Sequence, residues 1–215
     1  MKTTAALMLK APRPGTVKTR LAAEIGIESA TAIYKALVEH QLSQIPEGWA
    51  IAIHFTPDDA ESEMREWLSP YARGASFMPQ CPGNLGERMK ATVSHELRTG
   101  ADMVALIGGD CPYLTQKYLE SAASLAKNVD LVIGPAVDGG YVLLLLKHPH
   151  AALFDHIDWS TSRVLAQTRQ AAEVNHLCYM MMNPLEDIDD HASLCRGASP
   201  ISAKISSTGT EGCHF

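Results

Sequence analysis

The chain has 215 residues, of which 46% are hydrophobic and 20% are charged, as expected for a globular protein with one sizeable domain. Its formal net charge of −6 disfavours a broad nucleic-acid-binding surface, so any anion site has to be local. No apolar stretch reaches the roughly 18 residues that cross a bilayer, and no signal-peptide cleavage site follows the start.

Apolar runs of strand length alternate with amphipathic stretches of helical periodicity along most of the chain. The predicted strands cover residues 5–9, 49–55, 76–78, 103–107, 131–133, 141–146 and 177–182. The predicted helices cover residues 18–45 with a break at Gly26, then 58–68, 85–97, 116–126 and 160–172. Asp58 or Asp59 is expected to cap the helix at 58–68, and Ser160 or Thr161 the helix at 160–172. Because the strands carry little internal polarity, we predict an α/β domain with a mostly parallel sheet covered on both faces.

Residues 197–215 differ in composition from the rest, since Gly, Ser and Thr dominate and large apolar residues are few. We therefore expect one domain over residues 1–196 and a flexible C-terminal tail over 197–215. The five cysteines, at positions 81, 111, 178, 195 and 213, form no C-x-x-C pair. An odd number without such a pair favours reduced thiols and a cytoplasmic location over disulfides or structural zinc.

The first candidate site follows the strand at 5–9, where ligands of open α/β sheets gather. Two prolines stiffen the segment 11–20, and Gly15 permits a close approach to the backbone. Arg13, Lys18 and Arg20 are predicted to cradle a di- or triphosphate, with a plain turn and a solvated basic helix start as the alternative. The segment matches neither the Walker nor the dinucleotide-binding pattern.

The second candidate site is Asp110, which follows the strand at 103–107 and two glycines. A carboxylate here can hold Mg²⁺ or Mn²⁺ against a diphosphate, and the alternative is a turn former ahead of Pro112. Asp138 precedes the strand at 141–146 and can orient an acceptor hydroxyl, act as a base or join the metal shell. The Asp138-Gly139 pair also predicts a hairpin turn between two strands, and both interpretations can hold together.

Two further segments carry weaker signals. Asn84, with Glu87 three residues later, predicts an N-terminal helix cap, and Arg88 in the same segment can reach a phosphate or pair with an acid. Near the end, Asp187 or Asp189 can add a metal ligand, but a solvated acidic helix start is the favoured interpretation.

Together these segments resemble the radical-SAM/selenodomain-associated transferase family, some members of which are described as arsenosugar-biosynthesis glycosyltransferases. The matching segments, in chain order, are residues 11–15 with 17–21, 83–89, 108–114, 134–141, 159–161 and 185–189. The resemblance implies the GT-A fold of nucleotide-diphospho-sugar transferases, a three-layer α/β/α Rossmann-like sandwich with a mixed, mostly parallel sheet. It also implies similarity to molybdenum-cofactor and 2-phospholactate guanylyltransferases, in which the first loop contacts the nucleotide and the Asp of an x-Asp-x-Pro segment binds Mg²⁺.

Carried onto this chain, the resemblance assigns contacts with the nucleotide phosphates to Arg13, Lys18 and Arg20, and Mg²⁺ to Asp110. We predict Asp138 and Lys18 as catalytic residues and Mg²⁺ or Mn²⁺ at Asp110 as the cofactor. The residues expected to contact the nucleotide are Ala11, Arg13, Gly15, Lys18, Arg20, Gly83, Asn84 and Arg88. The residues expected to contact the rest of the substrate are Gly139, Gly140, Tyr141, Trp159, Ser160 and Thr161.

The sequence therefore predicts a metal-dependent transferase that acts on a small nucleotide substrate, a nucleotide sugar or a nucleoside triphosphate, and on a small acceptor. The family description favours glycosyl transfer from a nucleotide-diphospho-sugar. Asp110 followed by Cys111-Pro112, in place of Asp-x-Asp, favours nucleotidyl transfer with release of pyrophosphate. A non-catalytic nucleotide-binding protein is the third alternative. Neither nucleic acid nor membrane is expected as a partner.

Overall fold

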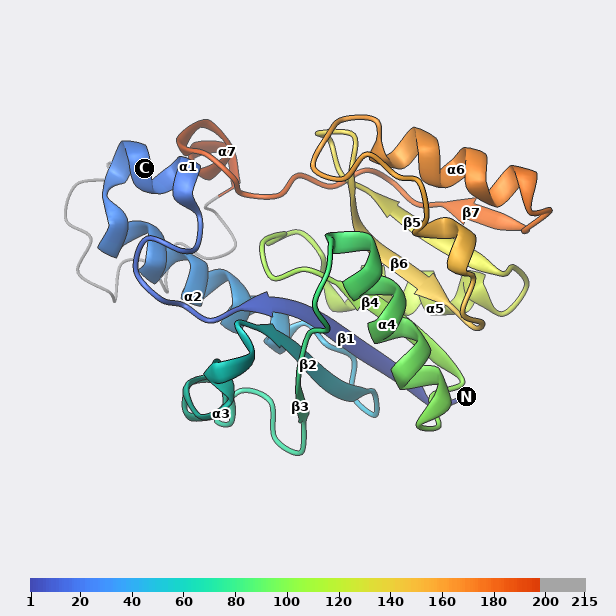
Figure 1. The fold of residues 1–215 in the computed structure, drawn as a ribbon, viewed down its shortest axis with the longest axis horizontal. Coiled ribbons are helices and arrows are strands. Elements are labelled where there is room, and N and C mark those ends of the chain that lie inside the picture. Colours follow the sequence, from blue (N-terminus) through green and yellow to red (C-terminus); the bar gives the residue numbers. More distant parts are fainter. Residues whose placement is uncertain (198–215) are drawn as a thin grey trace.

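The computed structural model describes residues 1–197 and has one seven-stranded sheet with the strand order β3-β2-β1-β4-β6-β5-β7 (Figure 1). The strands are β1 (Thr3–Lys10), β2 (Ala50–Thr56), β3 (Ser76–Pro79), β4 (Met103–Ile107), β5 (Leu131–Pro135), β6 (Tyr141–Leu146) and β7 (Tyr179–Met181). All neighbouring strands run parallel except at β6, which pairs antiparallel with both β4 and β5. The predicted mixed, mostly parallel sheet is confirmed.

Helices cover both faces of the sheet, so the predicted three layers are confirmed as well (Figure 1). The helices are α1 (Thr19–Ile25), α2 (Ile27–Ser43), α3 (Glu61–Leu68), α4 (Leu85–Arg98), α5 (Gln116–Ala126), α6 (Val164–Val174) and α7 (His191–Gly197). Helices α2, α3 and α5 pack in one large core cluster, whereas α4 and α6 pack in a second cluster. Of the predicted tail over 197–215, all but Gly197 lies outside the described residues.

Side chains along each central strand point alternately into the two core clusters, so both faces of the sheet are buried. In β4, Met103, Ala105 and Ile107 face the first cluster, and Val104 and Leu106 face the second. Side chains of a strand point alternately to the two faces, so a strand that is buried on both has to be apolar throughout. This is why the short apolar runs of the sequence were sufficient to locate the strands.

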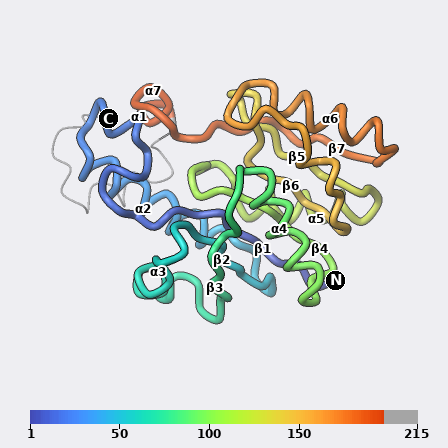
Figure 2. Tube along the Cα trace, viewed as in Figure 1, coloured from blue at the N-terminus to red at the C-terminus, as the bar shows by residue number. Residues whose placement is uncertain are grey.

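A third, smaller cluster of buried side chains joins α1, α2 and α7. Leu21 of α1 and Leu194 of α7 are fully buried there together with Ile188 from the segment ahead of α7. Figure 2 shows this segment running from β7, at one end of the sheet, to α7 beside α1. The C-terminal part of the domain is thereby fixed next to the loop that follows β1.

No helix among the described residues combines the length and the apolar character needed to span a bilayer.

Two predicted helix caps are wrong. Asp58 and Asp59 lie in a 3₁₀ turn (Asp58–Ala60) ahead of α3 and make no capping hydrogen bond. Helix α6 begins only at Val164 with Arg163 at the cap position, so Ser160 and Thr161 lie too far ahead of the helix to cap it. The hydroxyl of Thr161 donates instead to the carbonyl of Asp158. The predicted capping box of Asn84 and Glu87 at the start of α4 is confirmed.

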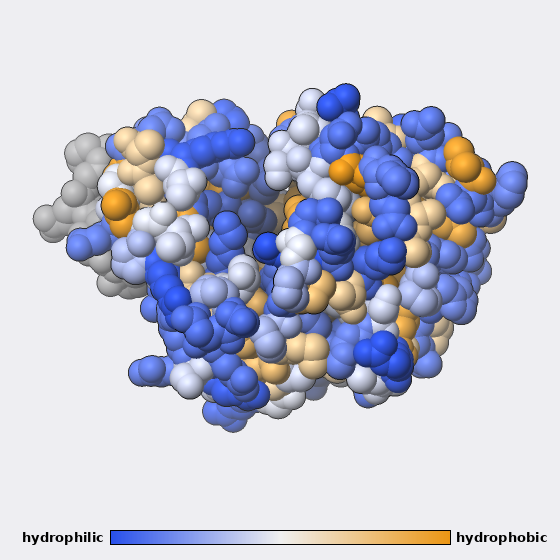
Figure 3. All heavy atoms as spheres, viewed as in Figure 1, coloured by the Kyte–Doolittle hydropathy of each residue, from blue (hydrophilic) through white to orange (hydrophobic). Residues whose placement is uncertain are grey.

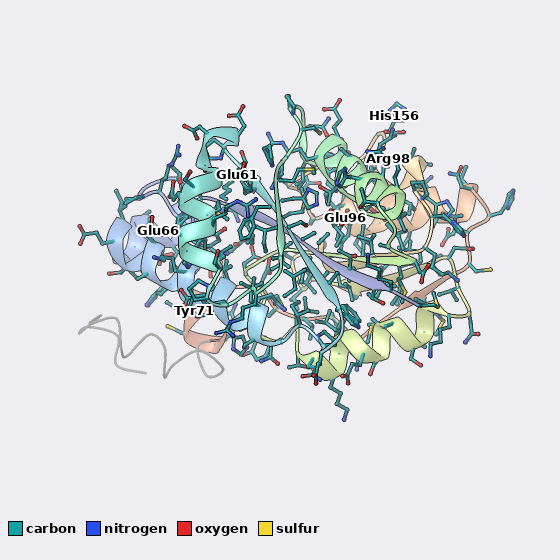
Figure 4. The ribbon with its side chains drawn as sticks, turned by 90° about the horizontal axis from the view of Figure 1, so that it is seen from below. Glu61, Glu66, Tyr71, Glu96, Arg98 and His156 are labelled. Carbon is teal, nitrogen blue, oxygen red and sulfur yellow. The ribbon has the colours of Figure 1, made fainter. Side chains whose placement is uncertain are left out.

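One buried polar pair links the sheet to α4. Nε2 of His54 in β2 lies 2.8 Å from Oε1 of Glu96 in α4, and the two side chains are 3% and 10% exposed. Figure 4 shows Glu96 between α4 and the sheet, whereas Arg98 lies further along the helix. A buried polar group without a partner is costly, so each of these residues depends on the other.

We therefore expect Glu96→Ala to lower the free energy of unfolding by about 1–3 kcal/mol, because it leaves the imidazole of His54 buried and unpaired. Glu96→Gln retains a carbonyl and an amide that can bond to the ring, so its effect should be clearly smaller. Urea unfolding of both variants checks this, and equal losses in the two would contradict it.

Candidate active site

A cleft opens at the carboxyl ends of β1 and β4 and consists of two adjoining lobes of about 360 and 600 Å³. The first lobe is lined by residues 16–20, Tyr34 and the Gly108-Gly109 turn. The second lobe is lined by the start of β6 and by residues 159–162. Five residues line both lobes, and they are Met8, Arg20, Gly108, Asp110 and Asp189. Figure 3 shows the molecule hollowed between the part that carries α1 and the part that carries α6.

Lys18 reaches the junction of the two lobes. Its Nζ lies 3.2 Å from Oδ2 of Asp110 and 2.8 Å from Oδ1 of Asp189, and its side chain is only 6% exposed. Lys18 has a φ of 46°, and its carbonyl accepts the first hydrogen bond of α1 from Ala22. The left-handed backbone at the end of the loop aims the side chain into the cleft. The cationic loop and Asp110 therefore meet, as the sequence analysis expected.

Asp110 directly follows the Gly108-Gly109 turn at the end of β4. Gly109 packs so tightly in this turn that a Cβ atom would lie 2.7 Å from side-chain carbons of Leu9 and Val38. The turn therefore presses against the core, and the next residue points into the cleft. The following Cys111 is 3% exposed, and burial raises the pKa of its thiol to about 12. This thiol stays protonated at neutral pH and does not serve as a nucleophile.

Two more carboxylates join Asp110 from the segment between β7 and α7. Leu185 forms an isolated parallel bridge with Ala136, and the amide of Ile188 donates to the carbonyl of Asp110. These backbone bonds hold the segment against the end of the sheet. Carboxylate oxygens of Asp110, Asp187 and Asp189 lie within 4.8 Å of one another, and all three residues are half-buried.

The sequence analysis favoured a solvated helix start for these acids, and this is correct only for Asp190. Asp190 accepts a hydrogen bond from the amide of Ser193 and begins α7. Asp187 and Asp189, in contrast, flank Ile188, which is fully buried. This alternation, two acids around one core residue, is typical of an extended segment and was the available signal for a shared face.

The electrostatics of the junction follow from burial and charge. Burial alone lowers the pKa of Lys18, but the opposing charges of Asp110 and Asp189 outweigh it, so the pKa is raised and the ammonium stays charged. For Asp187, burial and the repulsion of Asp110, Asp189 and Asp138 raise the carboxyl pKa to about 7. One of the three carboxyls is therefore partly protonated at neutral pH.

Arg20 is the second cation at the junction, and its side chain is exposed. Within residues 1–197 no ion pair or hydrogen bond engages its guanidinium. An exposed Arg without an ion-pair partner is available for an anionic ligand. Lys10 lines the same first lobe.

Six of the eight predicted nucleotide contacts do not line the two lobes. Arg13 forms ion pairs with Asp59 and Glu63, each at 3.0 Å, which its charge alone did not reveal. Ala11, Arg13 and Arg88 line a separate cavity of about 250 Å³ beside the first lobe. Gly83 accepts a hydrogen bond from Arg88, and Asn84 caps α4. Gly15 has a φ of 78° and turns the loop two residues before Val17.

The second lobe brings together the residues predicted to contact the rest of the substrate. Gly140, Tyr141, Trp159, Ser160 and Thr161 line it together with Asp138. Tyr141 and Trp159 pack edge to face, with ring centroids 6.4 Å apart.

The predicted hairpin between β5 and β6 is confirmed, and Oδ1 of Asp138 accepts from the amide of Gly140 at 2.8 Å within it. Gly139 has a φ of 93° and touches the backbone of Ser162, so no side chain fits there. Gly139 thus contributes close packing between the hairpin and the loop at 159–162.

One family model matches the central part of the chain. The family model described as "uncharacterized protein conserved in bacteria (DUF2064)" matches residues 42–161, more than half of the chain. No curated protein matches the sequence at a significant level.

Solved structures share the fold. A protein from Desulfovibrio desulfuricans G20, provisionally named a nucleotide-diphospho-sugar transferase, is 26% identical with a TM-score of 0.82, over 96% of this chain and 98% of that one. The 4-diphosphocytidyl-2C-methyl-D-erythritol synthase from Anaerococcus prevotii DSM 20548 is 10% identical with a TM-score of 0.59, over 94% and 99%.

Rv0371c from Mycobacterium tuberculosis H37Rv, solved in complex with manganese, is 11% identical with a TM-score of 0.54, over 91% and 97%. These neighbours confirm the predicted fold. The name of the Desulfovibrio protein agrees with the expectation of a transferase enzyme.

The raised pKa of Asp187 predicts a pH dependence of stability. The unfolded carboxyl ionises near pH 3.8 and the folded one near pH 7, so unfolding releases a proton between these values and stability falls as the pH rises through them. In EDTA, we expect Asp187→Asn to remove this loss and to melt a few degrees above the wild type at pH 8. The difference should shrink towards pH 4. A difference in melting temperature between the two proteins that stays constant from pH 4 to pH 8 would contradict this prediction.

Proposed function

This chain belongs to the DUF2064 family, and we propose that it is a metal-dependent glycosyltransferase that uses a nucleotide-diphospho-sugar and a small acceptor. One observation carries the proposal. Two cations and three carboxylates meet at the junction between two lobes of one cleft. Such a junction suits a diphosphate, with the nucleoside on one side and the sugar on the other.

The residues present fit a divalent metal ion. Mg²⁺ and Mn²⁺ prefer oxygen ligands, and Asp110, Asp187 and Asp189 offer carboxylate oxygens that lie within 4.8 Å of one another. A bound ion would neutralise negative charge on the leaving diphosphate. Lys18 and Arg20 would bind the phosphate oxygens from the side of the first lobe.

The charge of the second lobe favours glycosyl over nucleotidyl transfer. Its charged lining residues are Arg20 at the junction and three acids, Asp110, Asp138 and Asp189. A phosphorylated substrate in this lobe would face net repulsion, whereas a sugar and an acceptor hydroxyl carry no charge. Trp159 and Tyr141 add an apolar wall on which a sugar ring can pack.

In the proposed reaction, an acceptor hydroxyl attacks the anomeric carbon while the bond from that carbon to the diphosphate breaks. Asp138 orients the hydroxyl and takes its proton as the new bond forms. The hydrogen bond from the amide of Gly140 holds the Asp138 carboxylate in the lobe. The finer assignment, to the radical-SAM/selenodomain-associated transferases, is likewise a proposal that rests on the sequence motifs.

Nucleotidyl transfer is the second candidate, and a specific observation favours it. Asp110 is followed by Cys111-Pro112 and not by a second acid, and one of the structural neighbours is named for diphosphocytidyl chemistry. The two reactions differ in the leaving group. Nucleotidyl transfer releases pyrophosphate, whereas glycosyl transfer releases a nucleoside diphosphate.

The test is a panel of UDP-, GDP-, CDP-, ADP- and dTDP-sugars and the corresponding triphosphates, each with Mg²⁺ or Mn²⁺. Thermal shift identifies the nucleotides that bind, and chromatography with a pyrophosphate assay identifies the product. We expect metal-dependent stabilisation by a nucleotide sugar and release of nucleoside diphosphate. Release of pyrophosphate would replace the first proposal with the second, and binding without any product would contradict both.

We expect Asp110→Asn to abolish metal-dependent stabilisation by the nucleotide while the melting temperature of the free protein changes little. The reason is that the amide binds a divalent ion far more weakly than the carboxylate does. Asp155→Asn is the matched control, since Asp155 is similarly exposed and also pairs with a lysine, Lys90 at 3.0 Å, outside the cleft lining. A large loss of stability in Asp110→Asn with intact nucleotide binding would indicate a turn-forming role instead.

A further inference from the structure

The ammonium group of Lys18 lies where a metal ion would have to bind. It contacts Oδ2 of Asp110 at 3.2 Å and Oδ1 of Asp189 at 2.8 Å, and both residues belong to the three-carboxylate cluster. The same oxygens therefore serve two possible cations. A divalent ion requires them at about 2.0–2.3 Å and carries twice the charge, so it repels an ammonium held at the same oxygens.

Lys18 has little access to water in this position. Its side chain is 6% exposed, and its backbone is fixed by the left-handed turn and by the hydrogen bond that starts α1. A buried ammonium that loses its carboxylates needs another anion. The first lobe, which Lys18 also lines, offers space of about 360 Å³ but no carboxylate besides Asp110 and Asp189.

The diphosphate faces the reverse problem. Without a metal ion, its charge would approach the three carboxylates of the junction while Lys18 remains bound to two of them. With a metal ion on the carboxylates, Lys18 is released and the phosphates gain a cation on each side. Each ligand thus removes the obstacle to the other, which is positive coupling between two binding events.

We propose that Lys18 is a resident counter-cation that exchanges partners, from Asp110 and Asp189 to the diphosphate, so that metal and diphosphate bind together and each binds weakly alone. The inference rests on the proposed function, because it needs a metal–diphosphate site at this junction. It adds a role for one residue, in which Lys18 couples the binding of metal and diphosphate as well as contacting phosphate.

Lys18→Met with Mn²⁺ and pyrophosphate as probes tests the exchange. Mn²⁺ binding is measured by the EPR signal of the free ion, with correction for the Mn²⁺–pyrophosphate complex in solution. In the wild type we expect pyrophosphate to raise the affinity for Mn²⁺ on the order of tenfold, within the range usual for coupled sites. In Lys18→Met, Mn²⁺ alone should bind on the order of tenfold more tightly, and the enhancement by pyrophosphate should largely disappear.

Lys10→Met is the matched control. Lys10 lines the same lobe and loses the same charge, but its known hydrogen bonds, to Tyr34, use only the backbone. Its affinity for Mn²⁺ alone should stay near that of the wild type. If Lys18→Met does not fold, Lys18→Asn replaces it, since Asn tolerates the positive φ of this position best.

The outcomes separate the two proposals. If the wild type binds neither Mn²⁺ nor Mn²⁺–pyrophosphate, both the proposed function and the exchange fail. If the wild type binds Mn²⁺ equally well with and without pyrophosphate, the exchange alone is overturned. An unchanged or weaker affinity of Lys18→Met for Mn²⁺ alone overturns it too and leaves the proposed function intact.

Discussion

The contact on which the site depends is that of the Lys18 ammonium with the carboxylates of Asp110 and Asp189. It joins segments that lie 92 and 171 residues apart in the chain, the loop after β1, the turn after β4 and the strand-like segment ahead of α7. The three carboxylates would repel one another without this cation, and the pKa of Asp187 shows that some repulsion remains. The cleft is held together by the same charges that would bind its ligand.

The order of the sheet explains why these segments can meet. β1 and β4 are parallel neighbours, so the loops after Lys10 and Ile107 leave the sheet at one edge. β6 is antiparallel and pairs Leu143 with Ile107, so its first residue, Tyr141, and the hairpin with Asp138 lie at that edge as well. Because this one strand is reversed, its first residues and not its last lie at the carboxyl ends of its neighbours, where Tyr141 and Val142 line the second lobe.

Periodicity and motif position predicted most of this architecture, because strands buried on both faces are apolar throughout and the key loops follow them directly. The ion-pair partner of each charged side chain was harder to predict. Arg13 and Lys18 both carry a positive charge in the same segment, yet Arg13 pairs with Asp59 and Glu63 at the start of α3 while Lys18 enters the cleft. The position of Asp187 beside Asp110 depends on backbone pairing with distant residues, which a local pattern does not contain.

The two lobes of the cleft also differ in the charge of their lining residues. The first lobe has Lys10, Lys18 and Arg20 on its lining, against two acids, whereas the second has only Arg20 against three acids. The anionic part of a ligand is therefore stabilised at the first lobe and the junction, because phosphates placed against Asp138 would be repelled. For a nucleotide sugar, this distribution of charge keeps the diphosphate out of the second lobe. The apolar wall of Trp159 and Tyr141 is then left for a neutral part of the substrate.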